Sequence, residues 1–340
     1  MLGSLWSLLL VFPTSLALTS VVTGASGYLG RAIVHELLGS NEDHPILALV
    51  RPTKVASEQA YWNDSPHVHV CPYDMLDGGV SFQEVLSNDT TPCTVYHVAS
   101  VFGPTDEHAQ TALDNVQGTQ DLIGCLTTDN CHRLVLTSSM AAVRGTGQTP
   151  QNGAYYTADD WNNVSQKGAN WGASYQWSKM ESERIAWELC RERGIPLTTL
   201  CPSFVFGPPY DASGSYSLEL VGQWVHGASP VQSRLFVDVR DVAQAHVAAG
   251  NKPEAVNQRY IVSTEARVPS GEIADWMKDV CRRTGLGEAD KIHYDADFDG
   301  GAIKIGDREV EATDRLEKEL GIRLRPVRET IEDMAQVLLQ

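Results

Sequence analysis

A glycine-rich turn near the amino terminus constrains the fold of this chain more than any other feature. Residues 19–23 are β-branched and apolar, as expected of a buried strand, and a helical pattern covers 28–38. Between them, Thr23–Gly30 reads T-G-A-S-G-Y-L-G. Glycines at such a turn let the backbone approach a pyrophosphate, and the helix N-terminus supplies N–H groups. A tight turn without a ligand is the alternative. We therefore expect a dinucleotide to contact six residues of the turn: Gly24, Ser26, Gly27, Tyr28, Leu29 and Gly30.

Strand and helix patterns alternate along the rest of the first two hundred residues. Short apolar runs predict strands at 46–50, 68–71, 94–98, 133–137 and 196–201, and helical composition covers 107–126 and 174–193. This alternation is typical of a parallel sheet with helices on both faces. We expect an α/β fold with a doubly wound parallel sheet of the Rossmann type.

The pattern loosens after Pro202, which suggests a division of the 340 residues into three parts. We expect a dinucleotide-binding domain at 18–202 and a smaller, mainly substrate-binding lobe at 203–340, with a strand near 258–262 returning to the sheet. Residues 1–17 form a hydrophobic extension.

The extension at 1–17 leaves the location of the protein open. It has no charged side chain, and Ser15–Ala17 resembles the small-residue cleavage site of a secretory signal. However, no Lys or Arg precedes the apolar run, and Pro13 interrupts it. We favour the cytoplasm, with the secretory pathway or the ER membrane as the alternative. Membrane contact is expected only through this segment, if it is retained.

The charge balance excludes some partners. The chain has 43 acidic and 26 basic side chains and a net charge of -17, so a nucleic-acid-binding surface is not expected. The seven cysteines form no C-x-x-C pair, and H-E-x-x-H is absent, so we predict no metal site. Asp295–Gly300 resembles half of a calcium-binding loop, but Gly306 stands where a bidentate Glu is required, which favours an acidic turn.

Two basic residues follow the second expected strand. Arg51 and Lys54 stand about 20 residues after the glycine turn, where NAD-binding proteins place an acidic residue on the ribose hydroxyl. A guanidinium can instead clamp a 2′-phosphate through forked hydrogen bonds. These residues favour NADP(H) over NAD, and an ordinary solvated loop is the alternative.

Tyr175 and Lys179 stand four residues apart in a helical pattern, so they share one face. A phenol has an ordinary pKa of about 10, and a nearby cation lowers it toward the range useful for acid–base chemistry. Ser139 follows a predicted strand, where its hydroxyl can hydrogen-bond a substrate oxygen that takes up charge.

Together these motifs resemble the extended short-chain dehydrogenases/reductases, over Thr19 to at least Val262. Within that group the chain is most similar to the dihydroflavonol 4-reductase-like branch. The motifs that carry the resemblance are Thr23–Gly30, Leu49–Pro52, His97–Ser100, Thr137–Ser139, Tyr175–Lys179 and Cys201–Pro208.

The resemblance implies roles for individual residues. Tyr175 matches the acid that protonates a carbonyl oxygen, Lys179 the lysine that lowers its pKa and binds the nicotinamide ribose, and Ser139 the catalytic serine. Further cofactor contacts are implied at Asp74 and Met75 (adenine), Ala99 (strand end), and Pro202 and Ser203 (nicotinamide end). For His97 and Asn115 we expect structural roles.

Two departures narrow the expected substrate. Arg144 stands where flavonoid reductases have an asparagine, and 173–179 lacks the N-W-Y-C-Y-G-K stretch of cinnamoyl-CoA reductases. Neither a flavonoid nor a CoA thioester is therefore expected. Four aromatic residues suggest an apolar or aromatic substrate instead: Phe204, Phe206, Tyr210 and Tyr216.

We thus expect an NADP-dependent carbonyl reductase that acts on a ketone or aldehyde, as a monomer or homodimer. Two alternatives on the same fold are an NAD-dependent nucleotide-sugar epimerase/dehydratase and a hydroxysteroid dehydrogenase. A third, of another class, is a non-catalytic NADP-sensing protein.

Overall fold

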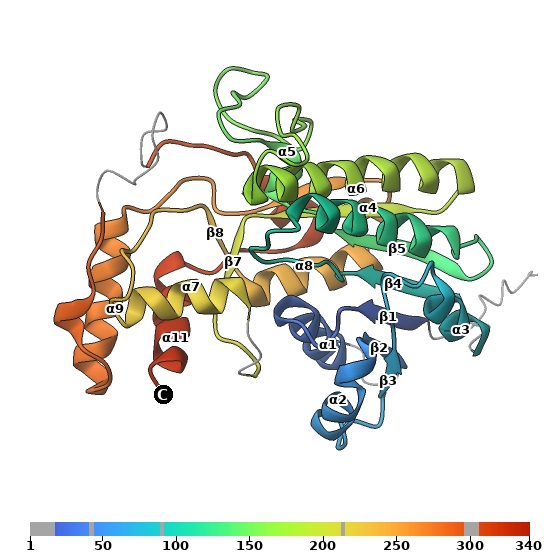
Figure 1. The fold of residues 1–340 in the computed structure, drawn as a ribbon, viewed down its shortest axis with the longest axis horizontal. Coiled ribbons are helices and arrows are strands. Elements are labelled where there is room, and N and C mark those ends of the chain that lie inside the picture. Colours follow the sequence, from blue (N-terminus) through green and yellow to red (C-terminus); the bar gives the residue numbers. More distant parts are fainter. Residues whose placement is uncertain (1–17, 41–43, 89–91, 212–214, 296–305) are drawn as a thin grey trace, which may run out of the picture.

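A seven-stranded parallel sheet forms the centre of the protein. The computed structural model describes residues 18–40, 44–88, 92–211, 215–295 and 306–340. The strand order is β3-β2-β1-β4-β5-β6-β9 (Figure 1). The strands are β1 (Thr19–Thr23), β2 (Ile46–Val50), β3 (Val68–Pro72), β4 (Cys93–His97), β5 (Cys131–Thr137), β6 (Leu197–Pro202) and β9 (Arg259–Val262).

Helices cover both faces of this sheet. They are α1 (Tyr28–Ser40), α2 (Val55–Tyr61), α3 (Val80–Asn88), α4 (His108–Gly124), α5 (Met140–Val143), α6 (Trp171–Arg193) and α8 (Val239–Asn251). The long helices α4 and α6 pack together along one face, whereas α1 and α8 pack together on the other (Figure 1).

Neighbouring residues of one strand belong to different cores. Val21 of β1 and Leu134 of β5 pack with the helices α3, α4 and α6, whereas Val22 and Val135 pack with α1 and α8. Successive side chains of a strand point to opposite faces. The uninterrupted apolar runs of the sequence therefore need helices on both faces, as a parallel sheet provides.

The sheet order reverses between β1 and β4, and this reversal fixes where a ligand can bind. β2 and β3 lie on one side of β1, and β4, β5, β6 and β9 lie on the other. In open α/β sheets, ligands bind outside the carboxyl ends of the strands at such a switch point. The glycine turn after β1 lies at this position.

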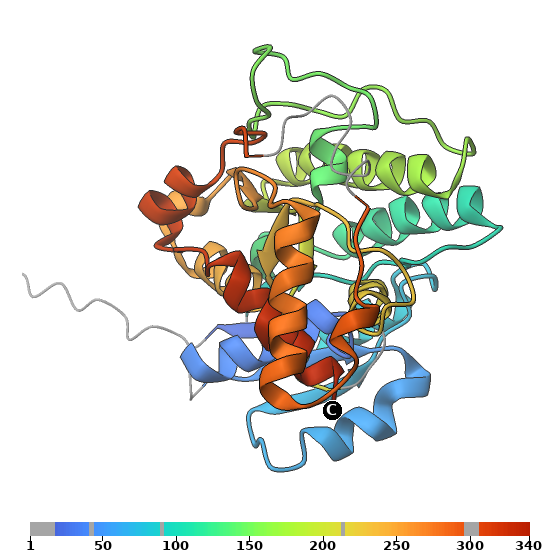
Figure 2. The same cartoon turned by 90° about the vertical axis from the view of Figure 1, so that its left-hand side faces the viewer.

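A smaller layer is built from later residues. It contains the two-stranded parallel sheet of β7 (Phe204–Phe206) and β8 (Phe236–Asp238), with α7 (Tyr216–Val225), α9 (Ser270–Thr284) and α11 (Val327–Leu338). The short helix α10 (Thr313–Arg315) lies instead beside β9, where Arg315 donates to the Arg259 carbonyl at 3.1 Å. Helices α9 and α11 lie side by side (Figure 2) around a third apolar core that includes Trp224 and Met277. Within the described ranges, no helix has the length and apolar character required to span a bilayer.

The predicted α/β class and parallel Rossmann-type sheet are confirmed. The helix expected from residue 174 begins earlier, at Trp171, because Asn170 caps it by accepting a hydrogen bond from the Ala173 N–H at 2.9 Å. The helix α8 was not predicted from the sequence. The calcium-like turn falls largely within 296–305, outside the described residues.

Candidate active site

Close backbone contacts in the glycine turn leave no room for a side chain at Gly24 or Gly30. Gly24 has a left-handed φ of +67°, and a Cβ there would lie 3.0 Å from the backbone N and Cα of Ala99, just after β4. A Cβ on Gly30 would overlap the carbonyl group of Gly24. The Gly27 N–H donates to the Gly24 carbonyl at 2.9 Å, and α1 begins at the next residue. This cradle, at a helix N-terminus, fits a pyrophosphate.

One residue of the turn, Tyr28, connects it to the loop after β7. The Tyr28 hydroxyl donates to the Gly207 carbonyl at 2.6 Å, and burial raises the pKa of this phenol well above its ordinary value. Leu29 is half-buried against the core that α1 and α8 share, and Ser26 is partly exposed. Tyr28 thus joins the start of α1 to a loop that follows β7.

The two basic residues after β2 are available to an anion. Arg51 precedes the short turn 52–54 and Lys54 ends it, and the Lys54 N–H donates to the Arg51 carbonyl at 2.8 Å. Both side chains are exposed, and neither forms an ion pair with any described residue. The closest acidic candidate in sequence, Glu58, is bound instead by Arg31. This arrangement fits a 2′-phosphate at the end of β2.

Asp74 and Met75 follow β3 at the same edge of the sheet. An Asp74 carboxylate oxygen accepts from the Leu76 N–H at 2.9 Å, which fixes the turn and leaves the residue exposed. The Met75 side chain lies against Gly118 of α4, where a Cβ would overlap it. The preceding residue, Tyr73, donates its N–H to the Val50 carbonyl at 2.8 Å, so the turn that carries Asp74 and Met75 begins next to the end of β2.

Ser139, Tyr175 and Lys179 meet where β5 ends. The Tyr175 hydroxyl donates to Ser139 Oγ at 3.4 Å, and Lys179 Nζ donates to the Thr137 carbonyl at 3.3 Å. Ser139 also caps α5, because its Oγ accepts from the Ala141 N–H at 3.1 Å. The helix α6 carries Tyr175 and Lys179 on one face toward the end of β5, as their spacing predicts.

Burial controls the protonation of this group. It raises the pKa of Tyr175, and the hydrogen bond to Ser139 opposes the rise only partly. Burial lowers the pKa of Lys179 to about 8, although Cys201 and Glu183 oppose that change. The pKa of Tyr175 is therefore raised and not lowered as expected, because burial outweighs the opposing contributions, and the Lys179 ammonium group donates to the Thr137 carbonyl.

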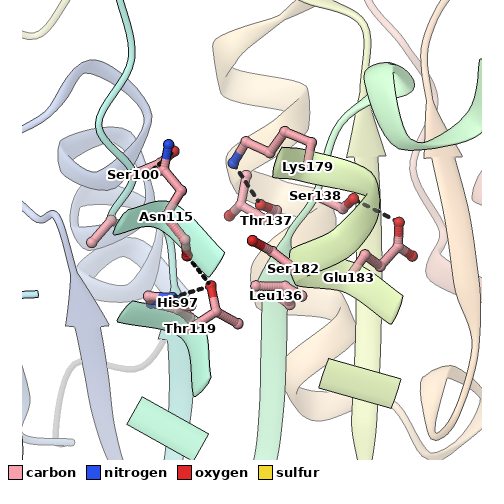
Figure 3. A pocket seen from close by; sticks show the side chains of 11 residues that line it. His97, Ser100, Asn115, Thr119, Leu136, Thr137, Ser138, Lys179, Ser182 and Glu183 are labelled. Atoms are coloured by element: carbon pink, nitrogen blue, oxygen red, sulfur yellow. Dashed lines mark hydrogen bonds between the residues drawn. The ribbon is translucent and has the colours of Figure 1, made fainter. Parts of the chain in front are cut away.

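A polar hollow lies beside Lys179, between β4 with α4 on one side and β5 with α6 on the other (Figure 3). His97 is fully buried, with Nδ1 2.9 Å from Thr23 Oγ1 and Nε2 3.5 Å from Thr119 Oγ1. Burial first, and Lys179 next, lower its pKa to about 3. Asn115 accepts from the Val101 N–H at 2.7 Å and donates to the Val101 carbonyl at 2.9 Å. These contacts hold the end of β4 against α4. Because its pKa is about 3, the His97 imidazole is neutral at neutral pH.

One buried group at the site was not identified from the sequence. Glu183, four residues after Lys179, is completely buried and accepts from Ser138 Oγ at 2.7 Å and from Arg259 Nε at 2.7 Å. Burial alone would raise the pKa of Glu183, but Arg259 and the hydroxyl donors hold it below its ordinary value. The i, i+4 spacing from Lys179 was the signal in the sequence that could have pointed to it.

Pro202 ends β6, and Ser203 follows it at the edge of the crevice. The Ser203 N–H donates to the Val262 carbonyl at 3.1 Å. Its Oγ is buried and has no hydrogen-bond partner among the described residues. A buried hydroxyl without a partner is costly, and a ligand at the carboxyl end of β6 would satisfy it.

Aromatic rings surround Tyr175, but only some of those we expected. The Phe102 ring centre lies 4.7 Å from that of Tyr175 and 5.6 Å from that of Tyr216. Phe204 joins this group through Tyr216, at 6.1 Å. The inclusion of Phe206 and Tyr210 was wrong. Phe206 is fully buried in the core around Trp224, and Tyr210 stacks on His35 of α1 at 4.0 Å.

The parallel sheet, the glycine cradle at its switch point and the Ser139–Tyr175–Lys179 group define an extended short-chain dehydrogenase/reductase. The chain belongs to the NAD dependent epimerase/dehydratase family, whose model matches residues 20–263.

The motifs predicted a member of the dihydroflavonol 4-reductase-like branch, and the relatives of the chain confirm this prediction. The chain is 30% identical to NADPH-dependent methylglyoxal reductase Gre2 of Saccharomyces cerevisiae, over 94% of this chain and 97% of the relative. It is also 30% identical to cinnamoyl-CoA reductase 1 of Arabidopsis thaliana, over 76% of this chain and 73% of the relative. The likeness to cinnamoyl-CoA reductases thus extends over most of the chain, although their N-W-Y-C-Y-G-K stretch is missing.

Solved structures show the same architecture. Yeast methylglyoxal/isovaleraldehyde reductase Gre2, complexed with NADPH, superimposes with a TM-score of 0.81 at 25% identity, over 94% of this chain and 98% of that chain. A UDP-glucose 4-epimerase from Thermotoga maritima shares the fold with a TM-score of 0.70 at 17% identity, over 94% of this chain and 98% of that chain.

Proposed function

We propose that this protein is an NADPH-dependent carbonyl reductase that converts a ketone or aldehyde to an alcohol. The observation that carries the proposal is the meeting of Ser139, Tyr175 and Lys179 beside the glycine cradle. The Gre2 relative is named an NADPH-dependent reductase, and a Gre2 crystal structure holds NADPH.

The chain's own residues fit the cofactor at four places. Residues 24–30 would hold its phosphates, and Arg51 with Lys54 its 2′-phosphate. Asp74, Met75 and Ala99 would line the adenine side and the adjoining crevice, and Pro202 with Ser203 the nicotinamide end. When bound, NADPH supplies a hydride to the carbonyl carbon.

Tyr175 and Ser139 would then act on the carbonyl oxygen. The phenol donates its proton to this oxygen as the alcohol forms, and the Ser139 hydroxyl donates a hydrogen bond to it. The raised pKa of Tyr175 keeps the phenol protonated at neutral pH, which is the form that reduction requires. Lys179, as a cation below about pH 8, would bind the nicotinamide ribose and favour the phenolate left after proton transfer.

The test uses the full-length protein and follows NADPH oxidation with a panel of ketones and aldehydes. Tyr175→Phe should lower kcat by at least about 100-fold, the usual contribution of a general acid, while the Kd for NADPH stays within about twofold. Tyr155→Phe, at a tyrosine whose ring contacts Arg308 instead, is the matched control and should keep full turnover. A Tyr175→Phe protein with unchanged kcat would refute the role of the phenol.

Cofactor preference separates the reductase from its alternatives. We expect NADPH to bind more tightly than NADH, and Arg51→Asp to remove this preference. Equal binding of NADH, or NAD retained through purification, would favour an NAD-dependent epimerase/dehydratase. NADPH binding without turnover of any carbonyl compound would favour a non-catalytic sensor. Reduction of steroid ketones, with no reduction of the other carbonyl compounds in the panel, would favour a hydroxysteroid dehydrogenase.

A further inference from the structure

A buried carboxylate joins α6 to the strands around it. Glu183 is completely buried and accepts hydrogen bonds from Ser138 Oγ and from Thr199 Oγ1, each at 2.7 Å. Arg259 of β9 donates to it from Nε at 2.7 Å and from Nη2 at 3.1 Å, which makes a forked ion pair. The pKa of Glu183 lies below its ordinary value, so at neutral pH its oxygens only accept hydrogen bonds.

The guanidinium of Arg259 is itself held on every side. Its Nη1 donates to the Ala158 carbonyl at 2.8 Å and to the Asp160 carbonyl at 2.5 Å, and its central carbon lies 3.9 Å from the Trp161 ring centre. A buried ion pair adds little net stability, because the cost of desolvating two charges offsets their attraction. A guanidinium held in this way instead fixes the orientation of the carboxylate that it binds.

Ser138 stands between two contacts of the proposed active site. The carbonyl of Thr137 accepts from Lys179 Nζ at 3.3 Å, and Ser139 Oγ accepts from the Tyr175 hydroxyl at 3.4 Å. The 2.7 Å hydrogen bond of Ser138 to the carboxylate is shorter than both (Figure 3). The residue that the buried ion pair holds is therefore the one that joins these two contacts along the chain.

We propose that Glu183 is a positioning residue of the reaction. Held by Arg259, its carboxylate fixes Ser138. This in turn orients the neighbouring Ser139 hydroxyl toward Tyr175. The inference rests on the proposed reductase function, in which neither the carboxylate nor Ser138 touches the substrate. A displacement of about 1 Å in an active site can lower the rate about 100-fold, so a fixed chain at the end of β5 acts on the chemical step.

Two matched substitutions separate positioning from stability alone. Ser138→Ala and Thr199→Val each remove one buried hydroxyl that donates to the carboxylate at 2.7 Å, and each leaves the ion pair in place. Only the first lies next to the proposed catalytic serine. The assay uses the full-length protein, NADPH and the ketone or aldehyde that the wild type reduces fastest. We expect kcat to fall at least about tenfold in Ser138→Ala and to stay within about twofold in Thr199→Val, with the Kd for NADPH unchanged in both.

Crystal structures of the same variants test the inference without turnover. Ser138→Ala should move Ser139 Oγ relative to the Tyr175 hydroxyl by more than about 0.5 Å, the tolerance of a catalytic constellation. Thr199→Val should leave both atoms in place. Ser138→Thr, which keeps the hydroxyl, should hold Ser139 in its wild-type position and retain most of the wild-type kcat.

The outcomes distinguish this inference from the proposed function. Equal kcat in Ser138→Ala and Thr199→Val, or an unmoved Ser139 in Ser138→Ala, overturns the positioning role even if the wild type reduces carbonyl compounds with NADPH. A Ser139 that is displaced in Ser138→Ala but not in Thr199→Val supports the role even if no carbonyl compound is reduced, a result that would refute the reductase function alone.

Discussion

Lys179 and Tyr175 lie four residues apart on α6, but their polar groups make different contacts. The ammonium group donates to the Thr137 carbonyl and the phenol to Ser139. Burial lowers the pKa of the first and raises that of the second. At neutral pH the pair is therefore a cation beside a protonated phenol, the combination suited to carbonyl reduction.

The pH dependence of the reaction should reveal this lysine. Below about pH 8 Lys179 is charged, and it loses its proton as the pH rises through that value. We expect kcat/KM for NADPH, which reports the free enzyme, to be level near neutrality and to fall about tenfold for each pH unit above about 8. Stopped assays over pH 6–10 measure this limb.

Lys179→Arg provides the matched control, because a guanidinium does not titrate in this range. Residual activity of this variant should lack the limb near pH 8. A wild-type profile that stays nearly level up to pH 10, as the ordinary lysine pKa of 10.5 would give, would contradict the effect of burial.

At the scale of elements, the turn from β1 into α1 tolerates no added atom at its closing glycine. A Cβ on Gly30 would overlap the backbone of Gly24, whereas a Cβ on Gly39, near the other end of the same helix, would meet no atom within 4 Å. The backbone around Gly30 therefore requires glycine, whereas the space around Gly39 would accept a larger residue. The first closes the cradle, and the second merely lowers helix propensity.

Alanine substitutions should separate these roles. Gly30→Ala should destabilise the protein by about 1–3 kcal/mol, the usual cost of overpacking, and weaken NADPH binding. Gly39→Ala should stabilise it by up to about 1 kcal/mol, since alanine favours the helix. Urea unfolding and NADPH titration of both variants measure the difference. Equal stability and affinity in the two would show that the turn can relax.

Local and long-range features of the site differ in how far the sequence predicts them. The cradle and the Tyr175–Lys179 pair depend on local spacing, so their places on elements followed from residue patterns. The pairing of Glu183 with Arg259 and the contact of Phe102 with Tyr175 join segments far apart in the chain. No local pattern specifies such contacts, and aromatic composition alone included Phe206 and Tyr210 wrongly.

At the scale of the whole molecule, late residues complete the early sheet. The strand β9 pairs with β6 in parallel, from Thr199 with Arg259 to Pro202 with Val262. The helix α8 packs against α1 on the face opposite to α4 and α6. The segment 239–262 therefore covers both an edge and a face that residues before 203 leave open.

A fragment of residues 18–202 should consequently fail to fold on its own. Its β6 edge and the apolar face of α1 would be exposed, and such surfaces promote association. We expect a broad, non-cooperative thermal transition and no NADPH binding, measured by circular dichroism and fluorescence against the intact chain. A sharp transition with NADPH affinity close to that of the intact chain would show that α8 and β9 are dispensable.

The position of α8 and β9 also has a consequence for biosynthesis. Chains are made from the amino terminus at about 5–20 residues per second, and exposed apolar surface on incomplete chains favours aggregation. A nascent chain that has emerged only as far as β6 already contains the nucleotide cradle but not the segment that covers α1. While residues 203–262 are being made, which takes roughly 3–12 seconds at that rate, the incomplete chain exposes the apolar surface of α1. We expect chaperones that bind apolar surface to act in this interval.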